Sequence, residues 1–167
     1  SERHTAAWGA AVAASGEDMA ALQKFAQDQA GGNVGALAAL QVAQKQIAKG
    51  DRAAATATVL AVRNDAGVSA DLRDLATLWW VRLVADDPAH RPEDLRAALK
   101  PLMRDNARPF EFPARIEDAA ILAHRMNDYA GAIKILDPMV NNPALPYTLS
   151  ERARAMVDVY RAQENKK

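Results

Sequence analysis

The stretch "NDYAGAIKIL", residues 127–136, decides the fold because two other places in the chain share its pattern. These are "GEDMAALQKF", which starts at Gly16, and "GDRAAATATVL", which starts at Gly50. In all three, a small residue follows five positions after the first residue, and an apolar residue follows nine positions after it: Ala21 and Phe25, Ala55 and Val59, Ala132 and Leu136. Gly16 and Gly50 are 34 residues apart. Recurrence at such a period indicates an array of repeated units.

Each position of this pattern has a physical role in a helix hairpin. A Gly or Asn at the bend accepts a positive φ angle, and an Asp directly after it caps the next helix. The small residue lets two helix axes approach closely, and the larger apolar residue fills the remaining space. We therefore expect helix hairpins that bend at Gly16, Gly50 and Asn127.

The composition favours an all-α chain. Alanine accounts for 38 of the 167 residues and aromatic residues for 5%. Alanine is the best helix former, and runs with the period of two that is typical of strands are absent. Breakers and caps predict about nine helices in successive antiparallel hairpins. The expected helices span approximately residues 5–14, 17–30, 34–49, 51–65, 70–85, 92–103, 114–125, 129–140 and 149–163.

The charge balance and the absence of cysteine limit the classes of partner and site. With 21 basic and 21 acidic residues, the chain offers no electrostatic reason to bind nucleic acid or an anionic membrane surface. No cysteine is present, so disulfides and thiolate metal sites are excluded. Apolar runs such as "LATLWWVRLVA" are interrupted by charge well before the ~20 residues that cross a bilayer.

The hairpin pattern resembles the tetratricopeptide repeat at its 34-residue spacing. The resemblance implies a right-handed stack of hairpins, and we therefore expect one domain over residues 1–167, made of degenerate repeats and a capping helix. The repeats are expected at about 5–32, 34–67, 70–104 and 113–145, and the capping helix at about 147–163. The chain departs from the repeat pattern in two ways. Gly50 and Asn127 are 77 residues apart, which is more than two repeats, and the longer loop "DDPAHRP" stands where the pattern has a tight turn. A helix bundle without repeats is the alternative.

The order of three segments is similar to a bacterial tetratricopeptide-like family that includes the ancillary subunit of the Sec translocon. The segments are "GALAALQVAQKQIAKGDRAAA", "LRDLATLWW" and "FEFPARIEDAAILAHRMNDYAGAIKILDPMVNNPALP". The resemblance covers about Met19 to Arg154. It implies a periplasmic domain that an anchor helix, absent from this sequence, holds at the inner membrane. It also implies translocon subunits or periplasmic chaperones as partners.

Residues that could support catalysis are few. The chain has three histidines, His4, His90 and His124, and no nucleotide-binding, zinc-protease or serine-hydrolase motif. Asp86, Asp87 and His90 could suggest a metal site, but we favour a polar loop with a helix N-cap as the interpretation of "DDPAH". His124 is expected near a helix end, where a cation interacts favourably with the helix dipole. We therefore expect no enzyme activity, cofactor or metal.

The adjacent tryptophans Trp79 and Trp80 indicate where a partner could bind. Neighbours on a helix point about 100° apart, so the two side chains cannot face the same core. Aligning "LRDL" with "LAAL" predicts Trp79 beside Gln44 on a groove, with Trp80 turned inward. The expected groove consists of Leu37, Leu40, Gln44, Ile47, Leu75, Trp79, Arg82, Glu117, Ile121, His124 and Arg125.

The sequence leaves open the place of the tryptophans, the structure of one apolar segment and the choice between two functions. Both tryptophans could lie in the core of a tightly curled bundle without a groove. The segment "RPFEF", residues 108–112, could form a linear apolar patch, but Pro109 and Pro113 favour a loop whose Phe side chains fill an apolar seam. The first functional hypothesis is a non-catalytic adaptor that binds proteins. The second is a module that assembles with itself into oligomers without any link to the translocon.

Overall fold

The structure is a computed structural model, and it describes residues 3, 6, 19–104 and 109–167. Eight α-helices and one 3-10 helix occur in these residues, with no strand among them. The expectation of an all-α chain is therefore confirmed. The bend expected at Gly16 lies outside the described residues, as does the helix expected over residues 5–14 except for Ala6.

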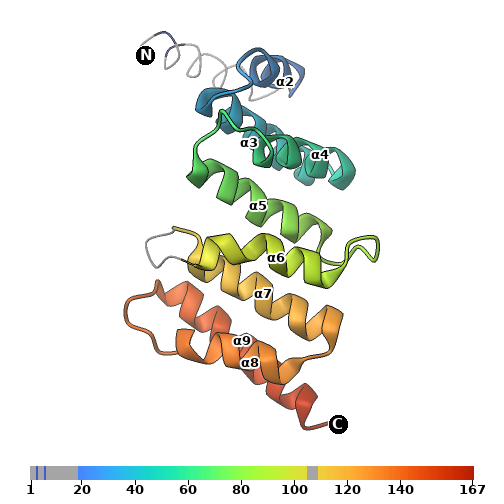
Figure 1. The fold of residues 1–167 in the computed structure, drawn as a ribbon, viewed down its shortest axis with the longest axis vertical. Coiled ribbons are helices and arrows are strands. Elements are labelled where there is room, and N and C mark those ends of the chain that lie inside the picture. Colours follow the sequence, from blue (N-terminus) through green and yellow to red (C-terminus); the bar gives the residue numbers. More distant parts are fainter. Residues whose placement is uncertain (1–2, 4–5, 7–18, 105–108) are drawn as a thin grey trace. The chain divides into compact units, whose positions relative to one another are not determined.

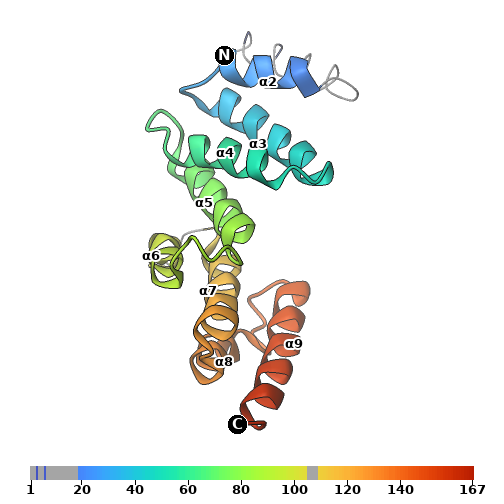
Figure 2. The same ribbon diagram turned by 90° about the vertical axis from the view of Figure 1, so that its right-hand side faces the viewer.

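The chain divides into two compact units, Ser1–Leu83 and Val84–Lys167. The helices are labelled in Figure 1, and Figure 2 shows them after a quarter turn. In sequence, the boundary separates the two helices of the expected repeat 70–104, so a single domain stays a prediction. The first unit contains α2 (Met19–Asp28), α3 (Asn33–Ala48), α4 (Arg52–Arg63) and α5 (Ala70–Val84), the last up to Leu83. The second contains α6 (Pro92–Met103), α7 (Glu111–Met126), α8 (Tyr129–Leu136), the 3-10 helix η1 (Asp137–Met139) and α9 (Tyr147–Glu164).

The bend between α3 and α4 forms as the sequence predicts. Gly50 has a φ of 81°, which a residue with a side chain adopts only at a cost. The Gly50 amide donates to the Ile47 carbonyl at 2.9 Å, and the Asp51 amide donates to the Gln46 carbonyl at 2.9 Å. These two bonds satisfy carbonyls that the end of α3 would otherwise leave without partners. The Asp51 carboxylate accepts from the Ala54 amide at 3.1 Å and so caps α4.

The bend between α7 and α8 repeats this arrangement in the second unit. Asn127 adopts the left-handed conformation with a φ of 53°. The Asp128 amide donates to the Leu122 carbonyl at 2.9 Å, and the Asp128 carboxylate accepts from the Gly131 amide at 2.8 Å. Two of the three predicted bends are thus confirmed, and their acidic residues cap the following helices.

A further contact of the first unit follows the 34-residue period. The Asp65 carboxylate, after α4, accepts from the Gly31 amide, after α2, at 3.0 Å. Its other oxygen accepts from the Gly67 amide at 2.9 Å. The Asn33 side chain accepts from the Ser69 amide at 2.8 Å. The loops that follow α2 and α4 are therefore joined side by side.

The packing of the first unit depends on small residues. Helix α3 packs against both α2 and α4 (Figure 1). Gly35 at the start of α3 is buried, and a Cβ atom there would lie 2.2 Å from the Gln29 carbonyl oxygen. Leu22 packs with Ala38 and Val42 in a core cluster. The alanine content therefore allows close contact between helices.

A buried core cluster of the second unit is built by residues of α7, α8, η1 and α9. Helix α8 packs against both α7 and α9, and Figure 2 shows α9 alongside this pair. Leu136, Met139, Val157 and Tyr160 belong to one buried cluster. Helix α6 is joined to α7 by an ion pair in which Arg96 Nε lies 2.7 Å from a carboxylate oxygen of the buried Asp118. This hydrogen bond raises the pKa of Arg96 above its ordinary value.

Two boundaries differ from those expected. Helix α7 begins at Glu111 instead of about residue 114, so part of "RPFEF" is helical and the loop prediction is partly wrong. Pro113 does not prevent this, because proline fits the first turn of a helix. The partly buried Phe112 packs against the core, as expected for the seam. Helix α8 ends at Leu136 instead of about residue 140, because Pro138 cannot continue the helix and η1 follows.

Candidate protein-binding surface

A hollow of about 350 Å³ lies on the first unit where α3, the start of α4 and the end of α5 meet. Trp79 from α5 and Gln44 from α3 both line it, so the structure brings together the pair that the alignment placed side by side. The remaining lining residues described by the structure are Ile47, Arg52, Arg82 and Leu83. We call this site the Trp79 hollow.

Helix α3 adds exposed apolar side chains to this surface. Ile47 is 44% exposed and lines the hollow, and Leu37 is 41% exposed. Leu37, Gln44 and Ile47 are spaced at seven and three residues, which places them on one face of the helix. Leu40 is only 4% exposed and lies in the core, so its expected place on the groove is corrected. Leu75 from α5 is half-buried.

A single hydrogen bond fixes Arg52 at the edge of the hollow. Its Nη1 atom donates to the Leu83 carbonyl at 3.0 Å and joins the start of α4 to the end of α5. Leu83 is near the C-terminal end of α5, where carbonyls lack partners within the helix. A cationic side chain therefore lies beside the half-buried Trp79 and the exposed Ile47.

Trp80 points to a different neighbour from Trp79. The Arg63 guanidinium of α4 lies over the Trp80 ring, 4.8 Å from its centroid. Arg63 Nε also donates to the Thr77 hydroxyl at 3.2 Å, so the same side chain ties α4 to α5. Trp79 and Trp80 are both half-buried. The structure therefore gives Trp80 a contact within the unit, while Trp79 lines a hollow.

The other four groove residues belong to the second unit, where two are buried. Ile121 is 2% exposed and Glu117 is 8% exposed, so neither offers a surface to a partner. Arg125 donates to the Ala85 carbonyl at 2.6 Å and to the His90 carbonyl at 2.7 Å. Its guanidinium therefore holds the "ADDPAH" loop against α7. The expected role of Ile121 and Glu117 in a groove is corrected, and that of the half-buried Arg125 stays a prediction.

His124 is exposed, and its neighbour is a tyrosine. Its Nε2 atom lies 3.3 Å from the Tyr160 hydroxyl, and the two rings meet edge to face with centroids 5.7 Å apart. Burial raises the pKa of Tyr160, and the negative charge of Glu117 raises it further. Tyr160 also packs beside Tyr129, with ring centroids 5.8 Å apart. This contact joins α7, α8 and α9.

The loop that could have suggested a metal has a local structural explanation. The Asp87 carboxylate accepts from the Ala89 amide at 2.9 Å, which is a turn formed by the loop itself. Among the described residues, no group of three or more His, Cys, Asp or Glu side chains could hold a metal ion. In the same part of the chain, no helix is both long and apolar enough to span a membrane.

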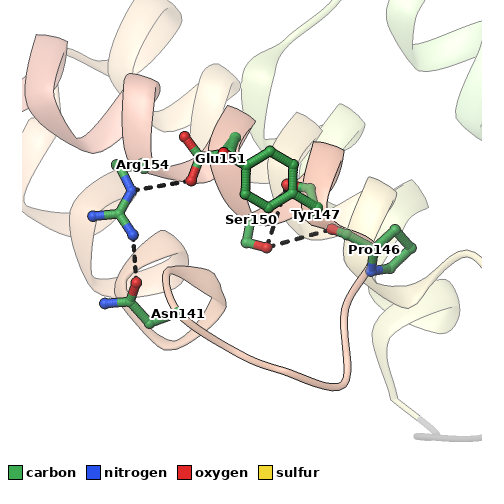
Figure 3. Close-up of polar contacts among 6 residues, drawn as sticks. All are labelled: Asn141, Pro146, Tyr147, Ser150, Glu151 and Arg154. Carbon is green, nitrogen blue, oxygen red and sulfur yellow. Dashed lines mark hydrogen bonds and ion pairs between the residues drawn. The ribbon is translucent and has the colours of Figure 1, made fainter.

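A polar hollow of about 370 Å³ in the second unit had no place in the sequence expectations. Figure 3 shows Arg154 of α9 between Glu151 and Asn141. Arg154 Nε lies 3.3 Å from a carboxylate oxygen of Glu151, and Arg154 Nη2 donates to the Asn141 side-chain oxygen. The Ser150 hydroxyl lies 3.4 Å from the Pro146 carbonyl at the start of the same helix. Asn141 has a φ of 66°, and "NNP" is the sequence signal for this turn. The polar groups here bond to one another and organise the start of α9.

A third hollow, of about 240 Å³, lies between α2, α3 and α4. Ala36, Ala39 and Val42 line this hollow, together with the polar residues Gln23 and Thr58. The small side chains that bring α3 close to its neighbours leave this space because alanine does not fill it. None of its described lining residues is a large exposed apolar side chain, unlike Ile47 in the Trp79 hollow.

Comparison with known proteins gives no relative. No protein-family model, no curated protein and no solved structure matches this chain.

Proposed function

We propose that the chain is a non-catalytic adaptor that binds a segment of another protein at the Trp79 hollow. The observation that carries the proposal is the position of Trp79 and the 44%-exposed Ile47 in one hollow beside Arg52. Tryptophan and arginine are enriched among the residues that contribute most to protein–protein binding. Aromatic and aliphatic groups gain free energy when a partner removes them from water.

The resemblance described above suggests the class of partner. On that basis we propose a periplasmic domain at the bacterial inner membrane, anchored by a segment outside this sequence. Translocon subunits or periplasmic chaperones would then be the bound proteins. The balanced charge of the chain favours a protein partner over nucleic acid.

Crosslinking from the hollow tests this function. A photoreactive phenylalanine derivative replaces Trp79 in the membrane-bound protein of the source cell, and captured proteins are identified by mass spectrometry. The matched control carries the same group at the exposed Ala57 of α4 in the same unit. We expect one discrete adduct from position 79 and none from position 57. Equal labelling from both positions would contradict the proposal.

Substitution of the tryptophan gives the quantitative test with the captured protein in purified form. Trp79→Ala is expected to raise its Kd about 30-fold, equivalent to about 2 kcal/mol, the loss typical of a central binding residue. The melting temperature should fall by far less than in Leu40→Ala, which removes a core side chain. A fall as large as that of Leu40→Ala would identify Trp79 as a core residue.

Self-assembly is the alternative function, and one observation on α9 favours it. Val159 is 55% exposed and Tyr147 is 76% exposed, so the last helix presents apolar surface outside the core. A second copy could cover these side chains. In the adaptor proposal they remain in contact with water.

A further inference from the structure

The charged residues that line the Trp79 hollow indicate which kind of protein segment it binds. We propose that the hollow binds a partner segment in which an apolar side chain is followed closely by Asp or Glu. The apolar side chain packs against Trp79 and Ile47, and the carboxylate binds the guanidinium of Arg52. This inference rests on the proposed protein-binding function and adds the chemistry of the segment.

The lining of the hollow supports this choice because its charge has one sign. Arg52 and Arg82 are its charged members, and no acidic side chain occurs among its described lining residues. Asp51 adjoins Arg52 in sequence, but its carboxylate accepts from the Ala54 amide as the cap of α4. A basic residue placed beside Arg52 would therefore meet a like charge, whereas an acidic residue would meet complementary charge.

Arg52 has the geometry to receive a carboxylate. A guanidinium has five N–H donors, and the contact with the Leu83 carbonyl uses one nitrogen, Nη1, at 3.0 Å. That contact also restrains the side chain, so less conformational entropy is lost when a ligand binds. The planar donor fork then allows paired hydrogen bonds to both oxygens of a carboxylate.

The apolar part of the segment follows from the other side of the hollow. Ile47 from α3 and Trp79 from α5 line it together, and Leu37 extends the exposed apolar surface along α3. Burying such side chains contributes affinity, while a carboxylate on Arg52 fixes the orientation of the segment. A small anion alone would leave the apolar side chains in contact with water.

Three synthetic peptides test the inference on the purified chain. They are 12 residues long, blocked at both ends and identical in Leu and Phe positions, and they carry Glu, Gln or Lys at the position after each apolar residue. The readout is the indole N–H resonance of Trp79 in ¹⁵N-labelled protein, assigned with Trp79→Phe and Trp80→Phe. We expect the Glu peptide to shift this resonance with a Kd about fivefold lower than the Gln peptide. The Lys peptide should bind more weakly than both.

Substitutions at Arg52 separate the carboxylate contact from general charge. Arg52→Gln should remove the preference for Glu over Gln, and Arg52→Lys should retain part of it because the charge remains. Arg91→Gln is the matched control: it removes the same charge from a side chain that is 73% exposed in the second unit, and it should leave the preference unchanged. Raising the salt concentration should reduce the preference.

The outcomes distinguish the two proposals. Equal binding of Glu and Gln peptides at Trp79 would overturn the acidic preference while supporting a binding site there. A preference that persists in Arg52→Gln would also overturn the inference. If no peptide shifts the Trp79 resonance, the inference fails. The adaptor function is then judged separately by the crosslinking from position 79.

Discussion

At the scale of single residues, two bends of different sequence use the same geometry. Gly50 and Asn127 both have positive φ angles, and each is followed by an aspartate that caps a helix. Asparagine tolerates this conformation better than other residues with a side chain, and glycine adopts it freely. The residue type at the bend therefore determines how much free energy the left-handed conformation costs.

Gly50→Ala is expected to reduce the free energy of unfolding of the first unit by about 1 kcal/mol, because alanine opposes a φ of 81°. Denaturant unfolding followed by tryptophan fluorescence measures this, since all three tryptophans precede residue 84. Asn127→Gly is the control, because glycine suits the left-handed bend as well as asparagine does. Far-ultraviolet circular dichroism should show little change for it. An unaffected Gly50→Ala variant would show that the bend does not need glycine.

At the scale of elements, side-chain acceptors join loops that are distant in sequence. Asp65 accepts from Gly31 and Gly67, and a Cβ atom on Gly67 would lie 2.1 Å from the Gly31 carbonyl oxygen. Such close approach is possible only where a residue has no side chain. The contact explains why consecutive hairpins of the first unit keep their loops together.

Asp65→Ala should therefore destabilise the first unit by about 1 kcal/mol, because two backbone amides lose a carboxylate acceptor. Amide hydrogen exchange should accelerate at Gly31 and Gly67. Asp65→Asn retains one acceptor oxygen and should protect one of the two amides. Unchanged exchange at both glycines in Asp65→Ala would contradict the role of this side chain.

Tyr160 gives the second unit a stability that depends on pH. Its pKa is raised above the ordinary 10.0 in the folded state, so folding favours the neutral phenol. The contribution is complete below about pH 10 and is lost as pH rises through the higher pKa of the folded state. Tyr160→Phe should show a smaller loss of melting temperature between pH 8 and pH 11 than the parent chain. Tyr147→Phe is the control, because its ring is 76% exposed and outside the core. Equal losses in Tyr160→Phe and the parent chain would contradict this assignment.

At the scale of the whole molecule, the two functional hypotheses differ in the expected mass. An adaptor whose α9 surface stays in water should scatter light as a monomer from about 10 µM to about 500 µM, since isolated apolar residues do not hold a dimer together. Self-assembly predicts a mass that rises with concentration. In that case Val159→Lys should restore the monomer, because it places a charge on the exposed face of α9.

Local signals explain which parts of the fold the sequence predicts well. Pro92 and Gly50 set the start of α6 and the end of α3 through backbone geometry that each residue imposes by itself. Helix ends without such signals are less certain. The first turn of α7 accepts Pro113, so the start of α7 falls three residues earlier than the alanine-rich pattern suggests.

The sequence by itself determined the helical class, the bends at Gly50 and Asn127 and the pairing of Trp79 with Gln44, because these depend on local conformation and on the repeat period. Only the tertiary structure decided which apolar residues remain at the surface. Leu37 and Leu40 have the same chemistry and are three positions apart, yet one is 41% exposed and the other 4%. Likewise, Arg125 binds two loop carbonyls and Arg52 binds one at the edge of a hollow. Burial and hydrogen-bond partners depend on neighbours that are distant in sequence, so periodicity alone does not specify them.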